Sequence, residues 1–150
     1  MKQEEAKQSS FPELHHIGLV VKDLNKTIEY LTSLGIGPFR PSGRVPVTER
    51  NLRGKLVPSK LEMRFARLGQ IELEVVQPIE GECIQMEFLK SQGEGIHHLG
   101  FAVDDIRGEM DKLTKQGIKI EQSGTRPIGG GFAFFKCEIP DFFIELTQQK

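Results

Sequence analysis

The sequence contains one segment twice, at a constant separation of 82 residues. The stretch His15–Val21 (HHIGLVV) returns as His97–Val103 (HHLGFAV), and nine of the 22 positions of His15–Ile36 are identical in the second copy. An internal repeat of this kind predicts two copies of one supersecondary unit, related by an approximate two-fold axis. Equivalent side chains then converge on that axis, so the repeated histidines are expected to face each other.

Length and composition indicate one ordinary domain. A chain of this size can bury roughly 70% of the surface that it exposes when unfolded. The two cysteines have neither C-x-x-C nor metal-finger spacing, which indicates reduced thiols and a cytoplasmic protein. No apolar run approaches the roughly 18 residues of a membrane span, and 20 basic against 21 acidic side chains give no overall field for nucleic acid. We therefore expect neither a membrane nor a nucleic acid as partner.

The first ten residues are charged and amide-rich, and predict a disordered arm over 1–10 before a single domain over 11–150. Each copy of the repeat begins a module, the first at about 14–80 and the second at about 96–148. Each module predicts a strand, a helix and three further strands. The apolar pattern over 83–91 predicts a short linker helix between the modules.

Aspartates and glycines mark the ends of the two repeated helices. Asp23 is the expected N-cap of the first helix, and either Asp104 or Asp105 that of the second. A glycine closes each helix. The later strands are expected in the irregular stretch that starts at Gly37, and at residues 61–68, 71–77, 118–122, 132–139 and 142–147.

The two βαβββ modules define an α+β fold. Each module alone would leave one face of its sheet uncovered. The modules are therefore expected to pack into a curved, eight-stranded mixed sheet, with helices outside and a pocket on the concave side. Such a pocket is the default location of a binding site.

Side chains of a strand alternate between its two faces, so only one histidine of each pair is expected to point into the pocket. His16 and His98 are each followed two residues later by glycine on the same face, which leaves room for a ligand beside the imidazole. We therefore predict that His16 and His98 face the pocket. His15 and His97 are expected to lie toward the helices or solvent, as supporting or capping groups.

Three glutamates share the expected concave face. If the apolar residues around them pack under the helices, Glu72, Glu74 and Glu145 look into the pocket. A carboxylate enclosed there must pair or bind a metal ion, because an unpaired buried charge is costly. Two imidazoles and two carboxylates would suit Co²⁺, Mn²⁺, Ni²⁺ or Zn²⁺. The alternative is that the histidines reflect retained packing and that the glutamates face solvent.

The same motifs resemble those of the vicinal-oxygen-chelate superfamily, and most of all those of its methylmalonyl-CoA epimerase family. The resemblance rests on His-Ile-Gly in the first strand, on His-His-Leu-Gly-Phe-Ala-Val-Asp-Asp, and on the terminal Ile-Glu-Leu-Thr-Gln. It implies the metal ligands His16, Glu74, His98 and Glu145. Glu74 is preferred to Glu72 because it lies four residues before the proline that closes the first module. Some epimerases have Gln at this position, so Glu74 makes the site more like that of a glyoxalase.

The resemblance also implies an activity, a substrate and an assembly. The expected reaction interconverts the 2R and 2S forms of methylmalonyl-CoA through an enolate, with an acyl-CoA as the bound partner. Glu145 would act as one base, and a short gapped alignment nominates Glu62 as the other. A homodimer is expected on the resemblance alone. Six basic side chains form either a solvated loop or a surface for CoA phosphates: Arg40, Arg44, Arg50, Arg53, Lys55 and Lys60.

Three other functions fit the expected fold. A glyoxalase I-like lactoylglutathione lyase would use the same ligands and related enediolate chemistry. A ring-cleaving dioxygenase would use two histidines and one glutamate around Fe(II), so a fourth ligand at Glu74 counts against it. A metal-free module that sequesters an antibiotic would have lost the His and Glu set, which is intact in this sequence.

Overall fold

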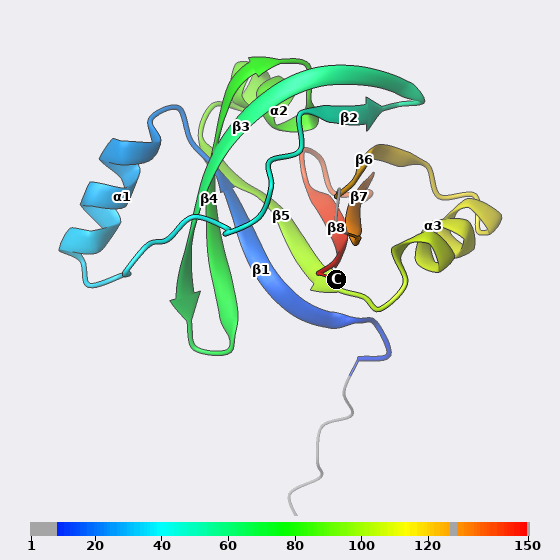
Figure 1. Cartoon of the computed structure of the whole chain (residues 1–150), viewed down its shortest axis with the longest axis horizontal. Coiled ribbons are helices and arrows are strands. Elements are labelled where there is room, and N and C mark those ends of the chain that lie inside the picture. Colours follow the sequence, from blue (N-terminus) through cyan, green and yellow to red (C-terminus); the bar gives the residue numbers. More distant parts are fainter. Residues whose placement is uncertain (1–8, 127–128, 150) are drawn as a thin grey trace, which may run out of the picture.

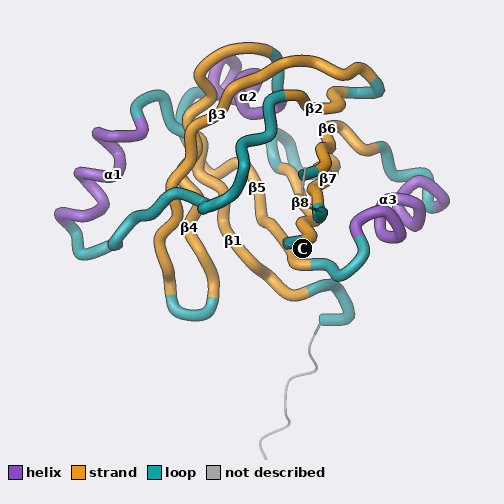
Figure 2. The backbone as a smooth tube through the Cα atoms, in the orientation of Figure 1, coloured by secondary structure: helices purple, strands orange, loops and turns teal. Residues whose placement is uncertain are grey.

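The computed structural model describes residues 9–126 and 129–149. The arm predicted over residues 1–10 thus falls, except for its last two positions, outside the described residues. Figures 1 and 2 show the path of the chain. Its elements are β1 (Glu13–Val20), α1 (Leu24–Ser33), β2 (Glu49–Leu52), β3 (Lys55–Leu68), β4 (Ile71–Gly81), α2 (Ile84–Gln92), β5 (Gly95–Ala102), α3 (Ile106–Lys115), β6 (Ile120–Thr125), β7 (Gly131–Lys136) and β8 (Phe143–Gln148).

The strands close into a barrel in the order β1-β4-β3-β2-β6-β7-β8-β5. β1 pairs in parallel with β4, and β5 in parallel with β8. β1 and β5, which carry the two copies of the repeated motif, are antiparallel neighbours. Each module therefore supplies one contiguous half of the barrel, and the halves meet at β1/β5 and at a short β2/β6 seam. The predicted α+β class and eight-stranded mixed sheet are confirmed.

Helices α1 and α3 lie on the outside of the barrel, on opposite sides of the view in Figure 1. The Oδ1 atoms of Asp23 and Asp105 each accept a backbone N–H three residues later, at 3.0 and 3.1 Å. Leu24 of α1 is buried in one cluster with Val21 and Val75. In the other half, α3 packs on β7 and β8 through Ile106, Leu113, Ala133, Phe135 and Leu146.

The predicted linker helix is α2, and it packs against residues of the barrel interior. Its Phe88 contacts Val20 and Val76, and its Ile84 joins a cluster of aromatic rings. Those rings are Phe132, Phe134 and Phe143. Among the described residues, no helix has the length and apolar character needed to cross a membrane.

The strand boundaries differ most from expectation where the sequence is polar. The first strand after α1 is β2, inside residues 40–60, which carry the six basic side chains and are called the basic segment. β3 begins six residues before the predicted start at Leu61. Arg53 and Gly54, both with positive φ, form the tight turn that pairs β2 with β3. The start of β3 was missed because Lys55, Pro58 and Lys60 interrupt the apolar alternation that predicts strands.

Candidate metal centre

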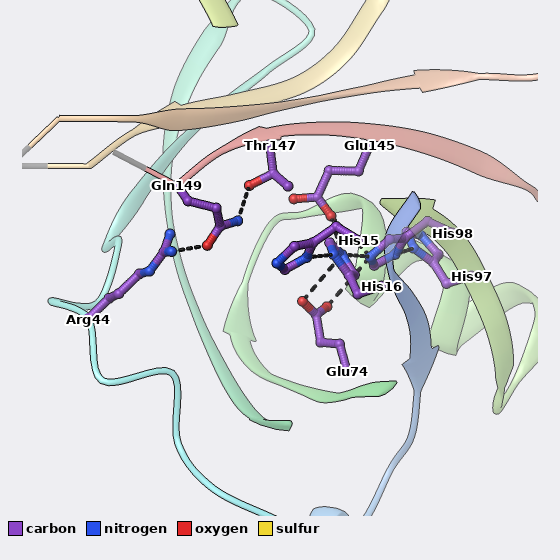
Figure 3. Close-up of polar contacts among 9 residues, drawn as sticks. All are labelled: His15, His16, Arg44, Glu74, His97, His98, Glu145, Thr147 and Gln149. Carbon is purple, nitrogen blue, oxygen red and sulfur yellow. Dashed lines mark hydrogen bonds and ion pairs between the residues drawn. The ribbon is translucent and has the colours of Figure 1, made fainter. Parts of the chain in front are cut away.

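Four side chains from four different strands converge inside the barrel (Figure 3). His16 of β1, Glu74 of β4, His98 of β5 and Glu145 of β8 are all buried, and one ligand atom from each lies within 4.8 Å of all the others. The Nε2 atoms of the two histidines are 3.1 Å apart. Glu145 Oε2 lies 2.8 Å from His16 Nε2 and 3.1 Å from His98 Nε2. We call these four residues the tetrad.

The repeated His-x-Gly motif explains why the histidines meet. In the β1/β5 ladder, His16 pairs with Gly100 and His98 pairs with Gly18. A Cβ atom added to Gly18 would lie 2.0 Å from the ring of His98, and one added to Gly100 would lie 2.0 Å from the ring of His16. Each imidazole thus lies over the glycine of the other module. The space that we expected for a ligand is filled by the partner imidazole.

The same glycines also set the positions of the two glutamates. In the parallel β1/β4 pair, Gly18 is the partner of Glu74, and in the β5/β8 pair Gly100 is the partner of Glu145. Paired residues project from the same face of a sheet. Each glutamate therefore lies beside the space above a glycine, where the imidazole of the other module sits.

Of the two histidines expected to lie toward the helices or solvent, His97 does contact a helix, because its ring meets Phe88 of α2 with centroids 5.0 Å apart. The prediction is wrong for His15. The β1/β5 register shifts between Leu14 and His16, and again where His97 falls between the paired residues Ile96 and His98. Both histidines are thus the extra residue of a β-bulge, where the alternation of faces fails. His15 borders the central cavity. His97 is fully buried and stacks on Phe143.

The displaced histidines hold the rings of the tetrad histidines. His15 Nδ1 lies 2.9 Å from His16 Nδ1, and His97 Nδ1 lies 2.9 Å from His98 Nδ1. Burial, the largest influence, lowers the pKa of His97 to about 3, so its ring is neutral and its Nδ1 can accept a hydrogen bond from the Nδ1–H of His98. A tetrad histidine that donates from Nδ1 has a bare Nε2, which is the tautomer that binds metal.

The two buried carboxylates of the tetrad carry negative charge that a bound cation would compensate. Burial by itself lowers the pKa of His16, but the charges of Glu145 and Glu74 outweigh it and raise this pKa to about 9. Burial raises the pKa of Glu145, whereas the charge and hydrogen bond of His16 hold it well below its usual range. A proton on His16 thus compensates part of the negative charge. The donor spacings of 2.8–3.6 Å also suit a metal ion, because bonds of about 2.0–2.2 Å place neighbouring ligand atoms about 3.0–3.4 Å apart.

Three residues of the tetrad, His16, Glu74 and Glu145, lie in the wall of a cavity of about 1060 Å³, and His98 is fully buried behind them. Glu72 lies in the same wall, but its Oε1 forms ion pairs with Arg40 and Arg67. The structure thus brings Glu74, and not Glu72, to the two histidines. A buried group of two imidazoles and two carboxylates at a cavity fits a divalent metal ion, and the geometry does not select which one.

A family model described as the Glyoxalase/Bleomycin resistance protein/Dioxygenase superfamily matches residues 15–135, which is most of the chain. The chain belongs to this superfamily. The resemblance inferred from the repeated motifs is therefore confirmed at this level.

Similar proteins of this superfamily include methylmalonyl-CoA epimerases. An ethylmalonyl-CoA/methylmalonyl-CoA epimerase of Cereibacter sphaeroides is 26% identical over 118 residues, or 77% of this chain and 79% of that protein. A methylmalonyl-CoA epimerase in complex with methylmalonyl-CoA and NH4+ has a TM-score of 0.68 at 19% identity, covering 93% of this chain and 95% of that one. The methylmalonyl-CoA epimerase of Mycobacterium tuberculosis has a TM-score of 0.66 at 20% identity, covering 98% of this chain and 94% of that one. These structures share the fold of this superfamily member.

The basic segment does not form one surface. Arg40 pairs with Glu72, and Arg53 pairs with Glu87 and Glu121. Arg50, in contrast, is buried inside the barrel. The sequence could not separate these roles, because the ion-pair partners lie on distant strands and on α2.

Glu62, the predicted second base, lies in the cavity wall but not at the tetrad. In the β3/β4 ladder it pairs with Gln77, whereas Phe65 pairs with Glu74. Because paired residues share a face and positions 62 and 65 differ by an odd number, Glu62 projects from the face opposite to that of Glu74. Its side chain is exposed. The structure therefore does not bring Glu62 to the other predicted site residues.

Sequence reasoning missed two other residues of the cavity. Arg126 follows β6 and Phe134 lies in β7, and both line the cavity. The ring of Phe134 contacts that of His98 edge-on, with centroids 5.0 Å apart. The alternation of β7, whose Phe132 and Phe134 share one face, could have indicated an aromatic interior wall. Arg126 lies outside any periodic segment and gave no such signal.

Replacing either repeated glycine by alanine should expel the imidazole above it. We expect Gly18→Ala and Gly100→Ala to weaken Co²⁺ binding by at least about tenfold while the barrel still folds, because a ligand displaced by an ångström loses its bond. Isothermal titration calorimetry measures the affinity, and circular dichroism measures folding. Gly95→Ala is the matched control, because its added Cβ would meet only Phe88, at 3.8 Å. Unchanged affinity in both variants would contradict the reciprocal packing.

Metal binding should release a proton below pH 9. The pKa of His16 is raised to about 9 in the metal-free protein, so the ring is protonated at neutral pH and must lose that proton to bind metal. The apparent affinity for Co²⁺ should rise by about tenfold per pH unit between pH 6 and 8. Calorimetry in buffers of different ionisation enthalpy measures the release. Glu145→Gln should shift the pH dependence of the apparent affinity to lower pH. A wild-type affinity that does not change with pH would contradict proton release from His16.

Proposed function

We propose that this protein is a divalent-metal-dependent epimerase of methylmalonyl-CoA or a closely similar acyl-CoA, which interconverts the 2R and 2S forms. The observation that carries the proposal is the buried tetrad, three of whose residues line a cavity large enough for an acyl chain. A relative of similar length is an ethylmalonyl-CoA/methylmalonyl-CoA epimerase. A structure with the same fold was solved with methylmalonyl-CoA.

Epimerisation removes the proton from the carbon between the thioester and the carboxylate, and returns a proton to its other face. A divalent ion held by His16, Glu74, His98 and Glu145 would supply Lewis-acid stabilisation of the negative charge that develops on the substrate oxygens. Of these four residues, the two histidines are fixed through their Nδ1 atoms. The chain's own contribution is then to move protons and to hold the substrate.

Glu145 is the proposed base on one face of the substrate carbon. Its Oε2 contacts both histidines and its side chain lies in the cavity wall. The histidine contacts lower its pKa, so it is ionised at neutral pH but only weakly basic while those contacts hold. A carboxylate in this position can accept a proton when its contact to a histidine loosens.

For the other face of the carbon we propose Glu62. It lies in the cavity wall where β3 extends beyond its pairing with β2, which ends at Pro58. The role requires the exposed side chain to turn over that strand edge onto the ligand. One protonated and one ionised carboxyl group would supply both the donor and the acceptor that an epimerase needs.

A glyoxalase I-like lactoylglutathione lyase is the second candidate function. It is favoured by one observation, the pair of carboxylates at Glu74 and Glu145, because an amide at position 74 is the pattern that some epimerases show. Both reactions shift a proton at a carbon next to a carbonyl group, so the tetrad alone does not separate them. The homodimer and the cytoplasmic location expected from the sequence are part of the same proposal. Sedimentation velocity would test the first.

Solvent exchange at the substrate carbon tests the proposal. We expect the Co²⁺-loaded protein to exchange the α-proton of methylmalonyl-CoA for deuterium in D₂O, as measured by NMR. Glu145→Gln should lower the rate by at least about a hundredfold, because the amide cannot accept the proton. The exposed Glu138 supplies the matched control, and Glu138→Gln should retain the wild-type rate.

Stoichiometric metal without exchange would contradict the epimerase proposal. Turnover of the glutathione hemithioacetal of methylglyoxal by the same sample would then favour the lyase. A Glu145→Gln variant with the wild-type rate would remove Glu145 as a base.

Glu62→Gln tests the second base separately. If Glu62 serves one face, this variant should keep its metal content and lose exchange from one enantiomer by about tenfold or more, while exchange from the other is less affected. Comparing the rates for separated 2R and 2S substrates measures this asymmetry. If the Glu62→Gln variant exchanges both enantiomers at the wild-type rate, Glu62 is excluded from the reaction.

A further inference from the structure

Arg50 is a buried guanidinium without a carboxylate partner. Only 5% of the residue is exposed. The part of the chain that the structure describes places no acidic group within ion-pair distance of it, although Arg40 and Arg53 each have such partners. A charge removed from water in this way is costly unless a counter-charge is supplied.

The contacts of Arg50 leave part of its hydrogen-bonding capacity unused. Nη1 donates to Ser59 Oγ at 2.7 Å and approaches the carbonyl oxygens of Val47 and Ser59 at 3.3 Å. Among the described residues, Nε and Nη2 have no acceptor. The side chain lines the cavity. The unused N–H groups are therefore available to a ligand in that space.

Arg126 is a second cavity arginine of the same kind. Its Nη1 donates to the carbonyl oxygens of Gln148 at 2.9 Å and Gly131 at 3.2 Å, and no described carboxylate lies within ion-pair distance. The guanidinium carbons of Arg50 and Arg126 lie 6.0 and 5.8 Å from the ring centre of Phe132. Burial, the largest influence, lowers the pKa of both arginines.

The position of these arginines relative to the tetrad defines the shape of the ligand. The tetrad belongs to the adjoining strands β4, β1, β5 and β8, whereas Arg50 belongs to β2, on the other side of the closed barrel. A row of ring contacts leads from His98 to Phe134 and Phe132, at 5.0 and 5.9 Å between centroids. Phe132 in turn contacts Arg50. A ligand at the tetrad that follows this apolar wall would meet the arginines.

We propose that Arg50 and Arg126 form an anion subsite, which holds an oxyanion at the far end of the ligand bound at the tetrad. The chemistry is that of a carboxylate or a phosphate, both of which arginine binds through paired N–H groups. That one end of the ligand binds at the tetrad rests on the proposed function. If the ligand is the acyl-CoA of that proposal, the oxyanion is either a second carboxylate or a CoA phosphate. The charges of Glu74 and Glu145 act on these arginines from a distance, but no described carboxylate pairs with either guanidinium, so a directly bound oxyanion would have to come from the ligand.

Calorimetry on the full-length, Co²⁺-loaded protein tests the subsite. Succinate represents the carboxylate source and adenosine 3′,5′-bisphosphate represents the CoA phosphates. We expect at least one probe to bind, and Arg50→Lys and Arg126→Met each to weaken it by at least about tenfold, because a paired charge-assisted hydrogen bond is lost. Binding of succinate alone assigns a carboxylate to the subsite, and binding of the bisphosphate alone assigns a phosphate.

Two controls separate this inference from the proposed function. Arg107→Met removes an exposed arginine outside the cavity and should leave the affinity unchanged. Binding should also persist after the metal is removed by chelation, and it does not depend on epimerase turnover. If Arg50→Lys fails to fold by circular dichroism, Arg126→Met decides the result. If neither probe binds, or if the folded variants keep the wild-type affinity, the subsite is overturned.

Discussion

The packing of two imidazoles over two glycines is the contact on which the geometry of the tetrad depends. His16 lies over Gly100 and His98 lies over Gly18, so the strands β1 and β5 can adopt only one register. A slip by one residue would move every side chain of a strand to its other face. The same contact therefore joins the two halves of the barrel and places four donor atoms around one point.

Burial of the tetrad costs free energy, and packing in other parts of the fold offsets this cost. Two carboxylates are buried beside two imidazoles, and burial of such groups costs several kcal/mol per ion unless a counter-charge is present. Apolar packing under α1 and α3 stabilises the outer layers, while the β-bulges bring His15 and His97 inward to hold the rings. The apolar packing of the outer layers thus stabilises a barrel whose interior carries groups that bind a cation and groups that bind an anion.

Residue patterns predicted the order of the elements, the Asp23 cap, and a pocket with His16, His98 and three candidate glutamates, because periodicity and duplication are local or self-similar signals. The choice of Glu74 over Glu72 came from the family resemblance. Three features escaped the same reasoning. The bulges at His15 and His97 break the alternation that was used to predict faces, and the partners of the basic segment lie far away in sequence. The cation-rich wall at Arg50 and Arg126 also needed the closed barrel, because β2 and the end of β6 meet only across its seam.

The sequence by itself determined that two equivalent modules would bring a histidine and a glutamate each to a shared axis. Its two copies of His-His-x-Gly are close enough in pattern to require symmetric packing. Only the tertiary structure decided which groups face one another across the cavity, because ladder register and barrel closure are set by contacts between strands that lie far apart in the chain. It is closure that places Arg50 on the far side of the barrel from the tetrad, with unused N–H groups toward the space between them.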